Sequence, residues 1–172
     1  KKYCSDGLVD YRAVKDDESL TGLLAYIAKD KDFSNSENRE AYYINVYNLF
    51  VISKISENYP VNSPNDISGF FTTKLFTLDG SKTSLNNIEQ VIAAPFQEPR
   101  FHFVMVCGAL SCPPITNFAY TQKNVHEQMD QQTILALNNA KFVYQVDSEK
   151  TIYLSEIFKW YKSDFGKSST EV

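Results

Sequence analysis

The longest amphipathic pattern of the chain contains the residues Glu40-Ala41-Tyr42-Tyr43-Ile44-Asn45-Val46-Tyr47-Asn48-Leu49. The pattern begins near Ser36 and ends before Pro60. It places Ala41, Ile44, Val51 and Ile55 on one face at helical spacing. The sequence therefore predicts one long helix here, and we expect it to be the central element of the core.

Shorter elements are predicted on both sides of this helix from apolar periodicity, capping residues and turn signals. The expected helices run from Ser19 to about Asp30, from Ser84 through Ile92, from about Gln122 to Asn139, and from Ser155 past Trp160. Hairpins are expected around Asp79-Gly80 and, between Phe142–Val146 and Thr151–Leu154, around Asp147-Ser148. A buried strand is expected from Phe101 to Val106. Together these elements predict an α+β fold in which the central helix and further helices pack on an antiparallel sheet.

Length and composition indicate one globular domain. The chain has 172 residues, 43% of them hydrophobic and 14% aromatic, which is enough for a dense core and excludes wholesale disorder. Lys and Arg number 17 against 21 Asp and Glu, with no basic run, so we expect no nucleic-acid partner. No apolar stretch is long enough to cross a bilayer, so no transmembrane segment is expected either. We treat residues 1–172 as one domain with short frayed ends.

The start of the chain and its cysteines bear on location. Lys1-Lys2-Tyr3-Cys4 stands where an initiating Met or a signal peptide would be expected, so we expect an N-terminal signal to have been removed. Three cysteines are too few for a disulfide scaffold, and their odd number leaves at least one without a partner inside the chain. The compartment stays open, with a periplasmic or secreted location as one interpretation.

Two cysteines stand in the segment Phe101-His102-Phe103-Val104-Met105-Val106-Cys107-Gly108-Ala109-Leu110-Ser111-Cys112-Pro113-Pro114. If Phe101–Val106 is a strand, alternation puts His102 and Cys107 on opposite faces, about 16 Å apart along it. This argues against a direct dyad of the two unless the strand breaks. Cys112 is the better nucleophile candidate, because a thiol before Pro113 would lie at the positive end of any helix that began there.

Other interpretations of the two thiols stay open. Cys107 and Cys112 could form a disulfide if the loop folds back, or both could be small buried hydrophobes. A shared metal is the weakest alternative, because the spacing matches no recognised tetrahedral site. We therefore predict neither a metal nor any other cofactor.

Three polar residues lie on otherwise apolar helix faces. Asn48 falls within the stripe of the long helix and Asn45 borders it, while Glu89 lies with Leu85 on the helix that follows Ser84. An unpaired buried amide costs roughly 1–3 kcal/mol, so each should have partners. The amides either clamp a neighbouring backbone or orient groups in a site, and Glu89 is either structural or catalytic. We expect Asn45, Asn48, Glu89 and His102 to converge near the thiol loop.

Several motifs occur in an order and spacing that together resemble one known family. They are Ala41-Tyr42-Tyr43-Ile44-Asn45-Val46-Tyr47-Asn48, Ile88-Glu89, Pro99-Arg100-Phe101-His102-Phe103, Cys107-Gly108 with Ser111-Cys112-Pro113-Pro114, and Ile157-Phe158-Lys159-Trp160-Tyr161 with Asp164-Phe165. The chain resembles the bacterial and plant family known as domain of unknown function 547, and the resemblance implies a family-like core of about residues 7–166. It departs from that family at Tyr43, where members usually have Trp, and at Gln90, where they have His.

The resemblance implies a fold more than a reaction, because the family has no assigned activity. It suggests a distant similarity to papain-like and transglutaminase-like folds, in which a central helix packs on an antiparallel sheet. If the compartment is extracytoplasmic, as for many bacterial members of such families, Cys107 and Cys112 would be oxidised together. If the family His acts as a base or ligand, Gln90 cannot replace it.

Two functions fit the sequence. The first is a thiol-dependent hydrolase or acyltransferase, with Cys112 or Cys107 as nucleophile, His102 as base, and Glu89 or Asn45 orienting it. The second is a non-catalytic binding or scaffold module with a polar structural core. The expected partner in either case is a small molecule, a peptide or a protein, which the sequence does not distinguish.

Overall fold

A long central helix, α3 (Ser36–Asn58), forms the middle of the computed structural model, as the apolar stripe predicts. The structure describes residues 2–73, 75–96, 98–109 and 112–166. Asn35 caps α3 by accepting a hydrogen bond from the backbone N–H of Asn38. The side chains that α3 buries lie around most of its circumference and include Ile44, Tyr47, Phe50 and Val51. A helix buried on this scale has to be covered from several sides.

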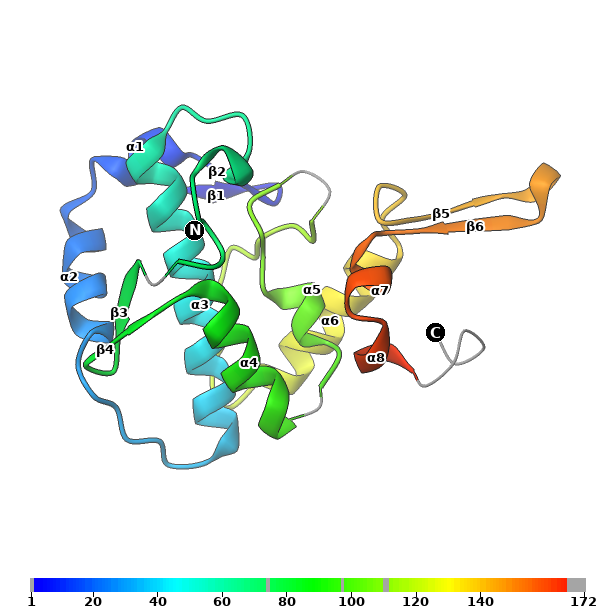
Figure 1. The fold of residues 1–172 in the computed structure, drawn as a ribbon. Helices are drawn as coiled ribbons and strands as arrows, with labels where there is room; N and C mark the ends of the chain where they lie inside the picture. The colour runs from blue at the N-terminus through cyan, green and yellow to red at the C-terminus, as the bar shows by residue number, and fades with distance from the viewer. Residues whose placement is uncertain (1, 74, 97, 110–111, 167–172) are drawn as a thin grey trace.

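Other helices pack around α3 and bury it. The helices in contact with α3 are α1 (Tyr11–Lys15), α4 (Leu85–Phe96) and α6 (Val125–Leu137). The strand β3 (Phe76–Leu78) packs against α2 (Glu18–Ile27), and Figure 1 shows these elements gathered around α3. Ser84 caps α4 through its hydroxyl, as its position before the apolar run predicts. Within the described residues, no helix is long and apolar enough to span a membrane.

The described strands form three separate antiparallel ribbons of two strands each. The pairs are β1 (Cys4–Ser5) with β2 (Leu8–Val9), β3 (Phe76–Leu78) with β4 (Ser81–Thr83), and β5 (Val143–Val146) with β6 (Thr151–Leu154). Asp79 and Gly80 make the β3–β4 turn with φ values of 46° and 73°, the geometry that a two-residue hairpin turn requires. The α+β class is confirmed. In place of one sheet beneath the helices, the described residues contain short ribbons at the edges of a helical core (Figure 1).

The expected strand at Phe101–Val106 is a prediction that the structure corrects. Residues Phe101–Val104 form a short helix, α5, and the chain becomes irregular after Met105. All four residues of α5 are buried, so the segment has no polar face whose spacing could separate a helix from a strand. Glu98 starts this turn by accepting a hydrogen bond from the backbone N–H of Arg100.

The helix α5 joins two hydrophobic clusters. Phe101 and Val104 belong to the large cluster around α3. Phe103 belongs to a smaller cluster with Phe142 and Ile157, which fixes the C-terminal segment to the body. That segment contains the β5–β6 hairpin, which projects away from the helices in Figure 1, and the helices α7 (Ile157–Trp160) and α8 (Lys162–Phe165). A single helical turn therefore holds the two parts of the fold together.

Gly108, in the irregular chain after α5, packs against α3. Its φ is +79°, a conformation that residues with a Cβ rarely adopt, and a Cβ at this position would collide with the Ile55 side chain. Leu110 and Ser111, which the sequence places in the turn between the two cysteines, lie outside the described residues, as do residues 1 and 167–172.

The same substitution at two glycines is expected to have opposite effects. Gly108→Ala should lower the free energy of unfolding by roughly 1–3 kcal/mol, because the backbone is left-handed and the space is filled. Gly22→Ala should raise it by about 0.5–1 kcal/mol, because Gly22 lies inside α2 with no atom near a new Cβ. Urea unfolding of both variants tests this, and a neutral or stabilising Gly108→Ala would contradict the packing described for this loop.

Candidate functional site

Four of the six predicted site residues meet in one cleft. The cleft has a volume of about 470 Å³, and Glu89, His102, Cys107 and Cys112 contribute to its lining. Its walls carry aromatic and apolar side chains, so we call it the aromatic cleft; these side chains are Tyr47, Phe71, Met105, Ile157, Trp160 and Tyr161. A concave apolar site with a few convergent polar groups is the usual form of a ligand-binding or active site.

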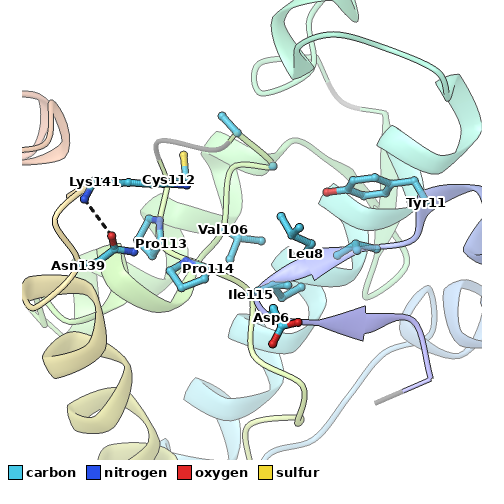
Figure 2. Close-up of a pocket in the computed structure, with 14 residues that line it drawn as sticks. Asp6, Leu8, Tyr11, Val106, Cys112, Pro113, Pro114, Ile115, Asn139 and Lys141 are labelled. Atoms are coloured by element: carbon cyan, nitrogen blue, oxygen red, sulfur yellow. Dashed lines mark hydrogen bonds between the residues drawn. The ribbon is translucent and has the colours of Figure 1, made fainter.

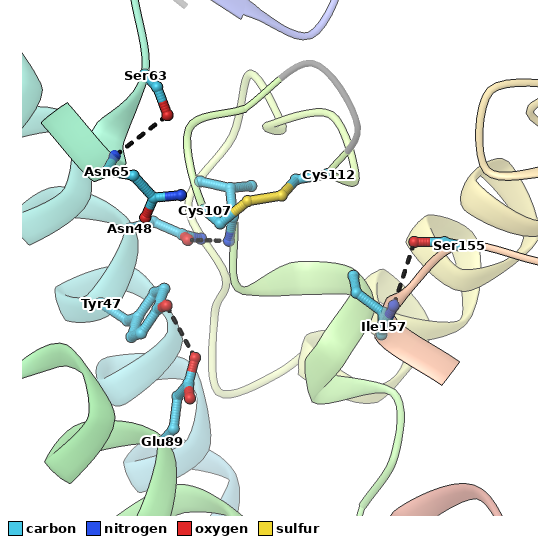
Figure 3. The surroundings of a disulfide bond; sticks show 10 residues. Tyr47, Asn48, Ser63, Asn65, Glu89, Cys107, Cys112, Ser155 and Ile157 are labelled. Carbon is cyan, nitrogen blue, oxygen red and sulfur yellow. Dashed lines mark hydrogen bonds between the residues drawn. A yellow bond between two sulfur atoms is a disulfide. The ribbon is translucent and has the colours of Figure 1, made fainter. Parts of the chain in front are cut away.

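Cys107 and Cys112 are joined by a disulfide with a Cα–Cα distance of 6.1 Å (Figure 3). The disulfide is one of the alternatives that the spacing leaves open, and both of its cysteines line the aromatic cleft. The third cysteine, Cys4, is free and half-buried, and it lies in β1 opposite Val9. In this oxidised state neither Cys107 nor Cys112 carries a thiolate.

His102 is a buried imidazole paired with a carboxylate. Its Nε2 lies 2.9 Å from Asp164 Oδ2, and its ring stacks on that of Tyr161 with 3.8 Å between centroids. Because a carboxylate only accepts, Nε2 carries the proton and Nδ1 keeps its lone pair. Burial lowers the pKa of His102, and Asp164 opposes this in part. The imidazole is therefore neutral at pH 7 and able to accept a proton.

The helical form of α5 overturns the argument that separated His102 from the thiols. An extended strand would put His102 and Cys107 on opposite faces, about 16 Å apart. Because α5 is a helix and the chain turns after Met105, both residues line the aromatic cleft. The structure thus removes the sequence-based objection to a histidine and a cysteine acting together.

Glu89 is a mostly buried carboxyl that two tyrosine hydroxyls hold in place. Tyr47 donates to Oε1 at 2.9 Å, as Figure 3 shows, and Tyr161 donates to Oε2 at 3.2 Å. Burial raises the pKa of Glu89, and the two hydroxyl donors oppose the rise without cancelling it. Glu89 therefore keeps its proton to higher pH than an exposed glutamate.

The side chains of Asn45 and Asn48 form hydrogen bonds with backbone groups and do not line the described wall of the cleft. Asn48 donates to the Val104 carbonyl and accepts from the Val106 N–H, both at 2.9 Å. Asn45 makes the same pair of bonds to Tyr120, at 2.8 and 2.9 Å. Neither amide is among the described residues of the cleft wall. Asn48 nevertheless positions the chain directly before Cys107.

Two residues of the site, Tyr161 and Asp164, were missed as functional candidates. Both belong to a motif of the family resemblance, which is the one signal that could have found them. Asp164 is 62 residues from His102 in the chain, so no local spacing predicts their contact. Within the part of the chain that the structure describes, no three His, Cys, Asp or Glu side chains are grouped so as to hold a metal ion.

The site lies in a chain of known family and unknown activity. A family model described as "Protein of unknown function, DUF547" matches residues 31–134, so the chain belongs to this family. No curated protein and no solved structure matches the chain. The papain-like and transglutaminase-like similarity therefore stays a prediction. The matched region contains α3, α4, α5 and both cysteines of the disulfide, and it ends before the segment that carries Tyr161 and Asp164.

Replacing Asn48 by Ala should lower the free energy of unfolding by roughly 1–3 kcal/mol, because it leaves a buried carbonyl and a buried N–H without partners. Asn58→Ala is the matched control, since Asn58 is exposed at the end of the same helix and bonds only the Lys54 carbonyl. Urea unfolding compares the two. Equal stability of both variants would show that the Asn48 bonds contribute nothing.

Replacing Glu89 by Gln should raise the melting temperature at pH 8 and leave it unchanged at pH 4. With its pKa raised in the fold, Glu89 binds more protons folded than unfolded, so its contribution to stability is lost as pH rises. Gln removes that ionisation. A gain at pH 4 equal to that at pH 8 would contradict the assignment.

Proposed function

We propose that the aromatic cleft is the active site of a thiol-dependent hydrolase or acyltransferase. In this proposal reduced Cys112 is the nucleophile, His102 the general base, and Asp164 the group that orients the imidazole. One observation carries the proposal: a neutral histidine bonded to a carboxylate lies in the same cleft as both cysteine sulfurs. Nucleophile, base and orienting acid are the three parts that covalent acyl transfer requires.

Cys112 is preferred to Cys107 because it is open on two sides. Cys112 lines the aromatic cleft and also a second cleft, whereas Cys107 lines only the first among the described pocket walls. No helix begins at Cys112 in the described residues that follow it, so a helix dipole does not support a thiolate there. Activation of the thiol therefore depends on His102.

The oxidised protein has to be reduced before this chemistry can begin. Two equivalents of a small thiol would convert the disulfide into two cysteine thiols and be released as its own disulfide. His102 Nδ1 then takes the proton of the Cys112 thiol as the sulfur attacks a substrate carbonyl. The imidazolium returns that proton to the leaving group, and water or another acceptor cleaves the thioester that results.

Glu89 has an indirect part in this proposal. Its carboxyl holds the hydroxyl of Tyr161, and the Tyr161 ring supports the His102 imidazole by stacking. Glu89 is thus a positioning residue that acts through Tyr161. Asn45, the other orienting residue that the sequence suggested, bonds to Tyr120 and has no such path to His102.

A non-catalytic binding module is the second candidate, and a specific observation favours it. Both asparagine amides and the Glu89 carboxyl are engaged in internal hydrogen bonds, and the two sulfurs are bonded to each other. A rigid cleft of this kind can bind a ligand without turning it over. In that case reduction of the disulfide should change ligand affinity and produce no acyl-enzyme.

Alkylation of the reduced protein tests the nucleophile. Cys112 should react with iodoacetamide near neutral pH with an apparent pKa below the roughly 8.5 of a free thiol, and His102→Ala should raise that value. Alkylation rates are measured from pH 5 to 9 with each cysteine changed to Ser in turn, which shows which thiol reacts. Cys4 serves as the internal reference. A Cys112 that reacts only after unfolding would exclude the catalytic proposal.

The turnover rate tests whether His102 acts as the general base. Against a panel of aryl esters, thioesters and peptide amides, the reduced protein should lose about 10²–10⁴-fold in kcat on His102→Ala substitution. His126→Ala is the matched control, because His126 is the only other histidine and lies exposed on α6 near Glu40. Equal activity of the two variants would remove His102 from the mechanism.

A further inference from the structure

A second cleft, which has a volume of about 340 Å³, adjoins the aromatic cleft. Figure 2 shows this second cleft between the N-terminal ribbon and the chain beyond α6. We call it the polar cleft after three of its residues, Asp6, Asn139 and Lys141. Cys112 and Ala109 line both clefts. Cys112, the preferred nucleophile, therefore lies at the boundary between the aromatic cleft and the polar cleft.

We propose that the two clefts are the two halves of one substrate site, and that the substrate is an extended peptide lying across Cys112. This inference rests on the proposed function for the position of the nucleophile. A side chain of the peptide occupies the aromatic cleft, and the polar cleft takes the residues on the other side of the bond that is cut. Both volumes lie in the range of about 300–1,000 Å³ that ligand sites have.

The chemistry of the aromatic cleft favours a peptide over a fatty acyl chain. Besides its aromatic rings, this cleft exposes polar groups of Ser63, Asn65 and Asn86 near its wall. A purely apolar ligand would cover these groups without giving them hydrogen bonds, which is costly. A peptide offers amide donors and acceptors to them and still places an apolar side chain against Trp160.

Each cleft also has one large apolar side chain that the fold leaves exposed. Trp160 is 66% exposed beside the aromatic cleft, and Leu8 is 60% exposed beside the polar cleft. Exposed aromatic and aliphatic side chains at a concave surface are typical anchors for a bound partner. The two anchors line clefts that share Cys112, so the proposed peptide has one anchor on each side of this residue.

The N-terminal wall of the polar cleft packs closely against the segment that follows Cys112. Gly7, in the turn between β1 and β2, has a φ of +75° and packs so closely on Pro114 that a Cβ would overlap the proline ring. Pro114 follows Cys112 by two residues, so the N-terminal ribbon is held against the loop that carries the nucleophile. The polar cleft is thus a built surface with a fixed position relative to Cys112.

Binding to the oxidised wild-type chain tests the inference separately from catalysis, since the disulfide prevents any thiol reaction. The probes are a fluorescein-labelled hexapeptide with phenylalanine at its third position, its two tripeptide halves, and lauroyl-glycine, all measured by anisotropy or by competition with the labelled hexapeptide. The hexapeptide should bind about tenfold or more tightly than either half. It should also quench the fluorescence of Trp160, the only tryptophan of the chain.

Two surface variants assign the halves. Trp160→Ala should weaken binding of the phenylalanine-containing half and of the hexapeptide, whereas Leu8→Ala should weaken the hexapeptide and the other half alone. Equal affinity of the hexapeptide and one tripeptide, insensitivity to Leu8→Ala, or binding of lauroyl-glycine without peptide binding would each overturn the inference. If the peptides bind as expected but the reduced protein shows no turnover, the peptide site stands and the catalytic proposal fails.

Discussion

Two side-chain amides on α3 hold the irregular part of this fold in place. Between Met105 and Asn124 the described chain forms no helix or strand, so its backbone donors and acceptors need partners from elsewhere. Asn48 and Asn45 each supply one donor and one acceptor, at Val104 and Val106 for the first and at Tyr120 for the second. They lie one helical turn apart, so a single face of α3 fixes both ends of the segment that carries the disulfide. Both clefts are lined in part by residues of this segment.

The second constraint is the burial of α5 on all its sides. One turn of helix sends Phe101 and Val104 into the core around α3 and Phe103 into the C-terminal cluster, which leaves His102 to meet Tyr161 and Asp164. The imidazole is thus oriented by a segment that follows the family match, while the cysteines belong to the matched region. The aromatic cleft exists because these two parts of the chain are packed together at α5. Tyr161 connects them further, since it stacks on His102 and donates to Glu89.

The sequence predicts the elements that apolar periodicity or turn residues mark, and it fails where neither signal is present. The long helix α3 and the turn at Asp79-Gly80 follow from periodicity and turn chemistry alone. The helix α5 could not be recognised, because four consecutive buried residues show neither helical nor strand spacing. For the site, polar residues on apolar faces identified Glu89, Asn45 and Asn48, since each needs a reason to be there. The pairing of His102 with Asp164 depends on tertiary packing across 62 residues, which no local pattern encodes.

Two titratable groups of the aromatic cleft, His102 and Glu89, have pKa values that burial shifts toward their neutral forms. Burial lowers the pKa of His102, so its contribution to stability is lost as pH falls below about 6.5, where the unfolded chain takes up the proton. Burial raises the pKa of Glu89, so its contribution is lost as pH rises above about 4.3, where the unfolded chain releases the proton. Between these two pH values, both groups lower the stability of the fold. Above this range only Glu89 does so, and below it only His102 does so. A core of apolar side chains would have no such cost at any pH. Two titratable groups that both favour their neutral forms, placed in one cleft beside a disulfide, are therefore better explained by what the cleft does than by what holds the fold together.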